Sequence, residues 1–214
     1  MSSQLFHFTG FDKSNGSFKP DIDALEILKR ILQSHHLLLT PNKVHLKLPK
    51  IGDLLSEIDV GVHMACLTET PLQFIAGHIA KYGKFGLGFT IEWALRNGGQ
   101  NVVYCDSNAP NSYTHTVAGI GGYLIRNGAA YDIQKVSWIA ELAAITERFE
   151  LRHKREWRFL RAPIIDDKLR GIKFSTEDLQ TIVCPRLHIA QIRKILEREG
   201  FTPNIMPTED YWIE

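Results

Sequence analysis

Apolar and polar positions along this chain follow two periods, one helical and one strand-like, which together indicate a mixed α and β protein. An apolar stripe that recurs every three or four residues predicts a helix capped by Asp21. The stripe consists of Leu25, Leu28, Ile31 and Leu32. Further helices are predicted at 71–80, around Trp93, at 138–149 and at 189–199.

Short β-prone runs bounded by glycine, proline and polar residues predict the strands. These runs cover 5–9, 60–67, 86–90, 101–105, 157–161 and 181–185. The remaining stretches are predicted as loops: 40–50 with room for one edge strand, 106–131 with a weak helix, and an irregular end from Pro203. Since no linker separates these elements, we expect a single α+β domain over 1–214, with a mixed or split β-sheet and flanking helices.

Composition and charge narrow the class of protein. An apolar fraction of 44% and a charged fraction of 23% are ordinary for a globular chain. A net charge of +1 gives no overall drive toward nucleic acid or an anionic membrane. No apolar run approaches the roughly 20 residues that span a bilayer. The start of the chain lacks the pattern of a secretory signal.

The cysteines and histidines favour a cytoplasmic protein without a metal site. Cys66, Cys105 and Cys184 are odd in number and far apart, which predicts reduced thiols rather than a disulfide framework. The histidines have neither the HExxH spacing nor partner cysteines at zinc-site spacing. We therefore expect no metal.

His7 is the first candidate for a binding role. Side chains alternate in direction along a strand, so His7 faces away from Phe6 and Phe8. If both rings enter the core, His7 faces a cleft or solvent, where a neutral imidazole can hydrogen-bond a ribose hydroxyl or a phosphate. The alternative is a surface histidine on an edge strand.

The segment 82–89, with the sequence YGKFGLGF, alternates glycines with aromatic residues. Glycine lets a backbone approach a ligand closely, and an aromatic ring offers a stacking face to a base or nicotinamide. The segment is no Walker loop, because GxxxxGK[ST] is missing, and no dinucleotide fingerprint, because its glycines lie within a predicted strand. The alternative is a β-turn and bulge that need glycine for their own geometry.

Glu156 stands among the basic residues Lys154, Arg155 and Arg158. Neighbouring cations favour the ionised form of a carboxyl group. An ionised carboxylate at the start of a strand can stabilise a developing oxocarbenium cation or accept a hydrogen bond from a ribose hydroxyl. The alternative is a structural anchor that pairs with arginine, which is the more common fate of such clusters.

The order FHFTG, CLTETPL, H-x3-YGKFGLGF-x3-W and a late EWR resembles the AbiGi family of bacterial abortive phage-infection proteins over about residues 5–200. It also resembles a larger, related bacterial family of unknown function. His153-Lys154 departs from the acidic residue that this related family often has before EWR. AbiGi proteins are usually described as antitoxins, which implies a cognate toxin as partner and raises the option of nucleic-acid binding.

A more distant resemblance is to ADP-ribosyltransferases, whose core grips NAD with a first-strand histidine, an aromatic residue after a helix and a late glutamate. It implies that His7 orients the nicotinamide-side ribose and that Tyr82 or Phe89 stacks on nicotinamide. It also implies that Glu156 stabilises the oxocarbenium-like transition state. The catalytic set on this reading is His7, Tyr82 and Glu156.

The same resemblance assigns an NAD-binding surface to other residues. Arg155 or Arg158 is expected to bind the pyrophosphate with two parallel hydrogen bonds. The full set of expected cofactor contacts is Thr9, Phe85, Phe89, Arg155 and Arg158. NAD is therefore the expected cofactor if the protein is an enzyme.

Two functions from different classes remain open. One is an NAD-dependent ADP-ribosyltransferase or NAD glycohydrolase that acts in anti-phage defence. The other is a non-catalytic antitoxin or regulator that binds a partner toxin, a nucleotide or DNA. The two differ in whether His7, an aromatic ring and Glu156 line one cleft.

Overall fold

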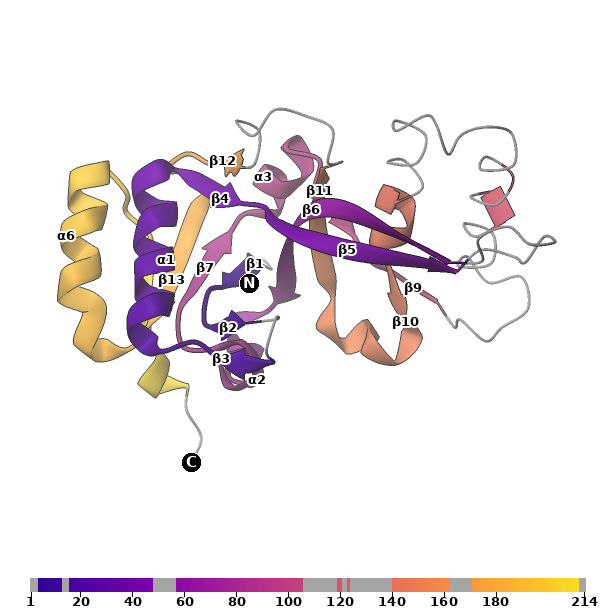
Figure 1. Ribbon diagram of the computed structural model, residues 1–214. Coiled ribbons are helices and arrows are strands. Elements are labelled where there is room, and N and C mark those ends of the chain that lie inside the picture. The colour runs from indigo at the N-terminus through magenta and orange to yellow at the C-terminus, as the bar shows by residue number, and fades with distance from the viewer. Residues whose placement is uncertain are drawn as a thin grey trace. The chain divides into compact units, whose positions relative to one another are not determined.

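The computed structural model describes residues 4–12, 16–47, 57–105, 119–120, 123, 140–161 and 171–211. Within these residues the predicted α+β class is confirmed, since helices lie against a mixed β-sheet (Figure 1). Most of the predicted 106–131 loop lies outside the described residues, as does the start of the predicted 138–149 helix.

The chain folds into two compact units. The first comprises Met1–Leu38, Leu67–Asn97 and Ile172–Glu214, and the second comprises Leu39–Cys66 and Gly98–Gly171. Each unit is therefore built from segments that are distant in sequence. The expectation of one domain over 1–214 stays a prediction.

The first unit holds most of the helices. They are α1 (Asp21–Ser34), α2 (Ile75–Tyr82), α3 (Ile91–Arg96) and α6 (Ile189–Glu199), with the 3-10 turns η1 (Leu72–Phe74), η5 (Arg186–His188) and η6 (Thr208–Asp210). The strands are β1 (Gln4–Phe8), β2 (Phe11–Asp12), β3 (Ser17–Phe18), β4 (His36–Leu38), β7 (Gly86–Phe89), β12 (Gly171–Lys173), β13 (Leu179–Cys184) and β14 (Asn204–Pro207).

The sheet of the first unit runs in the order β14-β13-β7-β1 and then the end of β6 (Glu57–Thr70). β1 is antiparallel to both of its neighbours, β6 and β7, and β13 is antiparallel to β7 but parallel to β14. The predicted strand at 86–90 is confirmed. The predicted irregular end is wrong, because the residues after Pro203 form β14 and pair with β13 along its length.

Helices cover both faces of this sheet. One face carries a buried cluster that includes α2 and consists of Phe6, Ile75, Ile79, Val183 and Met206. On the other face lie α1 and α6, side by side (Figure 1). The Thr9 hydroxyl donates a hydrogen bond of 2.9 Å to the Ala24 carbonyl, which ties α1 to the end of β1.

The predicted apolar stripe of α1 is confirmed, since each of its members is buried. The predicted cap is corrected. Pro20 occupies the N-cap position and no side chain caps the helix. Asp21 instead lies in the first turn, where a negative charge is favourable, and accepts a hydrogen bond of 3.1 Å from Lys84 Nζ.

The second unit is rich in strands. Its elements are β5 (Thr40–Lys47), most of β6, β8 (Gln100–Asn101), β9 (Val103–Cys105), β10 (Thr146–Arg148), β11 (Glu156–Arg161) and the 3-10 segment η3 (Phe149–Lys154). β5 pairs with β6 and β11 pairs with β8, both in antiparallel fashion. β9 pairs with β10 in parallel fashion. The sheet order is β6-β11-β8.

Two local expectations for the second unit are corrected in their extent. The edge strand for which the predicted 40–50 loop left room is present as β5, but it covers most of that segment, and even Pro41 has a cross-strand partner, His63. A proline is tolerated there because β5 pairs with a strand on one side and can leave its nitrogen on the other. The predicted 138–149 helix is also too long: only 140–144 are helical in the described part, and β10 follows.

Two glycines of the first unit bring separate backbone segments into direct contact. A Cβ placed on Gly10 would lie 2.9 Å from Gly83 Cα, and a Cβ on Gly83 would lie 2.7 Å from Gly10 Cα. Gly83 also has φ +100°, a conformation that residues with a side chain rarely adopt. Only glycine therefore fits at the end of α2.

The substitution Gly83→Ala is expected to lower the free energy of unfolding by about 1–3 kcal/mol, because it strains the backbone and overlaps Gly10. Urea denaturation measures this change. Gly77→Ala is the matched control, since Gly77 lies in α2 and an added Cβ meets nothing within 4 Å. That control is expected to raise stability by about 1 kcal/mol. Equal effects of the two substitutions would contradict the close approach.

Candidate functional site

The structure divides the candidate residues between the two units. His7, Thr9, Tyr82, Phe85 and Phe89 belong to the first unit. Arg155, Glu156 and Arg158 belong to the second. The convergence of an imidazole, an aromatic ring and Glu156 on one cleft stays a prediction.

His7 is half-buried in β1, with Leu87 as its cross-strand partner in β7. β1 has a strand on either side, so the alternative of a histidine on an edge strand is wrong. Phe6 is buried in the cluster with α2, and alternation therefore turns His7 toward the face that carries α1 and α6.

Tyr82 lies at the end of α2 within a stack of rings. Its ring centroid is 6.2 Å from that of Phe8 and 5.8 Å from that of His78, and it meets Phe11 edge-on at 6.3 Å. Phe8 points to the sheet face opposite His7. The structure therefore does not bring Tyr82 and His7 onto the same face of the first unit's sheet.

Thr9, Phe85 and Phe89 are buried in the first unit. Phe85 and Phe89 are both 0% exposed, and Thr9 is 3% exposed with its hydroxyl bonded to α1. The Phe89 ring stacks on Trp93 at 4.3 Å, and the Phe85 ring lies 5.4 Å from His188. A ring without solvent access offers no face to nicotinamide, so in this arrangement both rings are core residues.

The glycines of β7 make room for the rings of β1. A Cβ on Gly86 would lie 3.0 Å from the Phe8 ring, and a Cβ on Gly88 would lie 2.8 Å from the Phe6 ring. Each glycine is the direct cross-strand partner of the ring that covers it. Gly86 and Gly88 thus serve packing between two neighbouring strands. The turn and bulge considered from the sequence are also present, since Gly83 has φ +100° at the end of α2 and the pairing of β13 with β7 shifts register opposite Gly88 and Phe89.

Glu156 begins β11 and is engaged by Arg158 through both carboxylate oxygens. Arg158 Nε donates to Glu156 Oε1 at 2.8 Å, and Arg158 Nη2 donates to Oε2 at 3.2 Å. The two side chains lie two residues apart on one face of the strand and are only 12% and 10% exposed. The pairing is the two-bond fork that guanidinium and carboxylate groups favour.

Arg158 is the centre of a larger buried network. Its Nη2 also donates to Glu147 Oε2 at 3.1 Å, and its Nη1 donates to the carbonyls of Ala144 and Thr146. Burial alone would lower the pKa of Arg158, but the hydrogen bonds to Glu156 and Glu147 and the charge of Glu156 hold it above its ordinary value. The guanidinium therefore clasps β11 to β10 and to the short helix at 140–144.

Tyr104 and Glu147 are parts of this network that the sequence did not reveal. The Glu156 backbone N–H donates to the Tyr104 hydroxyl at 2.8 Å. Burial raises the pKa of that hydroxyl, while its hydrogen bond with Glu156 opposes the rise. Both residues lie in sequence segments without a recognisable motif, so only the pairing of β9 with β10 brings them to Glu156.

Arg155 differs from Arg158 in its surroundings. It is exposed and has φ +43°, in the left-handed region that favours glycine. This conformation forms the sharp turn from η3 into β11. Arg155 and Arg158 therefore do not share one binding surface, since Arg155 is exposed and Arg158 is buried.

The CLTETPL motif also has a structural explanation. Thr68 and Thr70 lie on one face of β6 with their hydroxyl oxygens 3.1 Å apart, and Thr70 Oγ1 lies 2.9 Å from His78 Nε2. This chain of polar groups joins the end of β6 to α2. Threonine and histidine at these spacings thus stabilise the contact between a strand and the helix that follows it.

Among the described residues, no group of three or more His, Cys, Asp and Glu side chains is arranged to hold a metal ion. No helix in this part of the chain is long and apolar enough to cross a membrane. None of the described cysteines, Cys66, Cys105 and Cys184, is in a disulfide, and burial raises the pKa of Cys184 to about 12.

Arg158→Met is expected to lower the free energy of unfolding by about 3–5 kcal/mol, because it leaves the Glu156 and Glu147 carboxylates without their buried cation. Thermal or urea denaturation measures the loss. Adding Glu156→Gln to Arg158→Met should recover part of it, since one uncompensated charge is removed.

Arg186→Met is the control for this experiment. Arg186 pairs with Asp210, but its side chain is 63% exposed, so its loss is expected to change stability by less than about 1 kcal/mol. An equal loss of stability in Arg158→Met and Arg186→Met would contradict a stabilising role for the buried Arg158 network.

Comparison of the chain with protein-family models, curated proteins and solved structures finds no match. The resemblances to AbiGi proteins and to ADP-ribosyltransferases therefore rest on the sequence motifs alone. The geometry accounts for several of these motifs as packing and pairing: the glycines of 82–89 with the rings of β1, the threonines of CLTETPL with His78, and the late glutamate with Arg158.

Proposed function

We propose that this protein is a non-catalytic regulator in bacterial anti-phage defence, and that it acts in the cytoplasm by binding a partner protein. The observation that carries the non-catalytic part is the engagement of both Glu156 oxygens by Arg158. The defence role is supported by the motif resemblance to abortive-infection antitoxins. That resemblance also makes a cognate toxin the first partner to consider.

The state of Glu156 bears directly on catalysis. To stabilise an oxocarbenium-like transition state, a carboxylate must direct its charge at the reacting sugar. Here the nearest cation is the protein's own guanidinium, which holds the carboxylate by two hydrogen bonds. A charge already neutralised inside the protein contributes little additional stabilisation to a substrate, and freeing it would leave Arg158 buried with less compensation.

The residues expected to hold NAD do not form a binding surface within the first unit. Phe85 and Phe89 are fully buried, and the Thr9 hydroxyl is used to bond α1. Tyr82 and His7 lie on opposite faces of the sheet. These residues therefore do not fit NAD as they stand.

The second candidate function is an NAD-dependent ADP-ribosyltransferase or NAD glycohydrolase acting in the same defence role. The observation in its favour is that Glu156 lies at the first position of β11 with exposed Arg155 beside it. Such a position suits a glutamate that meets a ligand at a strand end. Nucleic acid is a weaker candidate partner, because the net charge is only +1.

Incubation of the purified protein with NAD, followed by chromatographic detection of nicotinamide, separates these functions. The regulator is expected to release no more nicotinamide than buffer alone, with or without added nucleic acid. Glu156→Gln, which keeps an acceptor oxygen for Arg158, is expected to behave like the wild type. Release by the wild type that disappears in Glu156→Gln would instead establish the enzyme.

A further inference from the structure

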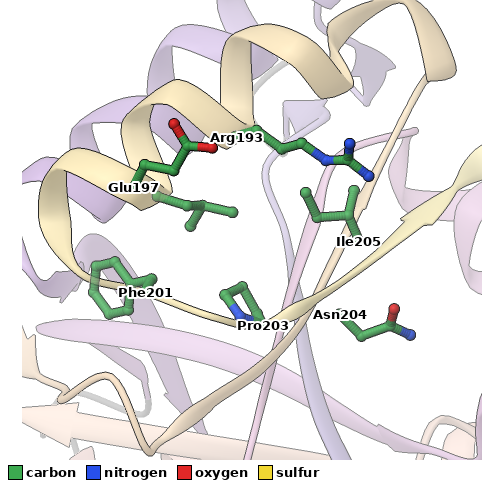
Figure 2. Close-up of a pocket in the computed structure, with 7 residues that line it drawn as sticks. Arg193, Glu197, Phe201, Pro203, Asn204 and Ile205 are labelled. Carbon is green, nitrogen blue, oxygen red and sulfur yellow. The ribbon is translucent and has the colours of Figure 1, made fainter.

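A hollow of about 300 Å³ lies between α6 and β14 in the first unit (Figure 2). Arg193, Leu196 and Glu197 line it from one stripe of α6, and Asn204 and Ile205 line it from β14. Its remaining wall is apolar and comes from Phe201 and Pro203 in the connection between the two elements. The hollow thus combines a helix, an apolar wall and a sheet strand.

β14 is the edge strand of its sheet. It pairs with β13 on one side, and the described residues place no strand on the other. An edge strand carries backbone N–H and C=O groups that can pair with an added strand. Proline has no N–H to donate, so Pro207 limits that pairing at one end and leaves the stretch from Asn204 to Met206.

The hollow lies on the same face of the sheet as alternate side chains of the edge strand β14. Met206 is buried in the cluster with α2, so its neighbour Ile205 points to the opposite face, where α6 lies. Ile205 is paired in register with the fully buried Ile182 of β13. A strand added beside β14 would therefore place every second side chain on the α6 side, next to Ile205.

The charge at the hollow selects the ligand. Arg193 is exposed, and in the described part of the chain its guanidinium forms no ion pair. Figure 2 shows the Arg193 guanidinium extending toward Ile205 on the strand side of the hollow, while Glu197 lies one helical turn away on the α6 wall. A carboxylate that arrives along the edge of β14 would meet this cation.

We propose that an extended segment of a protein partner adds to the edge of β14, with an apolar side chain in the hollow and a carboxylate on Arg193. Successive side chains on one face of a strand are two residues apart. The recognised pattern is therefore an apolar residue, any residue, and then Asp or Glu, in either direction along the segment. Backbone pairing supplies affinity, and the hollow and Arg193 supply specificity.

A second copy of this chain fits the same edge less well. The residues of β14, Asn204–Pro207, contain no acidic side chain that could meet Arg193. The nearby acids Glu209 and Asp210 already accept hydrogen bonds from Arg186. A partner that brings its own carboxylate satisfies the cation, whereas edge-to-edge pairing of two copies does not.

Selection of a phage-displayed random-peptide library on the full chain tests this site. The selected peptides are expected to share the apolar–any–acidic pattern, and synthetic versions should bind about tenfold or more weakly to Arg193→Glu. Lys194→Glu is the matched control, since it makes the same charge change at the next, exposed residue of α6 without lining the hollow. It should bind like the wild type.

Two further measurements address the edge itself. Ile205→Arg, which fills the hollow from the strand side, should weaken binding as Arg193→Glu does. Hydrogen exchange of the amides at 204–206 should slow when peptide is bound. Circular dichroism melts confirm that each variant is folded.

The site is overturned if the library yields no binder, or if binders are equally sensitive to Arg193→Glu and Lys194→Glu. Concentration-dependent dimers that vanish in Ile205→Arg would also overturn it, since the occupant would then be a second copy. The inference rests on the proposed function, because it names the partner class of the regulator. Nicotinamide release would refute the regulator and leave peptide binding standing, whereas failed peptide binding without nicotinamide release would refute only the site.

Discussion

A buried guanidinium must have its positive charge and its N–H groups satisfied by protein groups, because water is excluded. In this protein Arg158 takes the hydrogen-bonding capacity of the residues around it. Two carboxylates and two backbone carbonyls surround the cation. The free-energy cost of desolvating an unpaired charge exceeds the contribution of most single contacts in a domain. Arg158 therefore needs Glu156 and Glu147 as partners. This limits the catalytic options of the second unit, because its candidate catalytic carboxylate, Glu156, already stabilises the fold by pairing with Arg158.

Packing between β1 and β7 imposes a comparable constraint on the first unit. Phenylalanine rings on β1 lie over glycines on β7, and Gly10 and Gly83 touch backbone to backbone. Glycine is required at these positions by lack of space rather than by a ligand. In sequence, a segment that alternates glycines with aromatic residues resembles a nucleotide-binding loop. The same composition is found where aromatic rings on one strand pack over glycines on the neighbouring strand.

With Glu156 paired to Arg158 and with Phe85 and Phe89 buried, the surface site proposed for a partner lies in the first unit. The edge of β14 presents backbone groups, a hollow with one apolar wall and a cation from α6 within one site. Recognition by strand addition needs no catalytic side chain and is compatible with a small protein whose core residues are all engaged in folding. A regulatory role and this arrangement of polar groups are therefore consistent with each other.

The sequence by itself determined the α+β class, the buried stripe of α1 and the positions of β7, β11 and α6, because these depend on side-chain period over a few neighbouring residues. It also predicted that Glu156 lies beside a cation, and the structure pairs Glu156 with Arg158. Only the tertiary structure decided that the residues at 204–207 form a strand and that the strand allowed for within 40–50 covers 40–47, since their pairing partners β13 and β6 lie elsewhere in the chain. It likewise decided which cation holds Glu156, and that His7 and Tyr82 occupy opposite faces of a sheet. The hydrophobic pattern of a short segment does not specify which distant segment it will pair with. Such pairings form only when the sheet assembles and distant segments share one core.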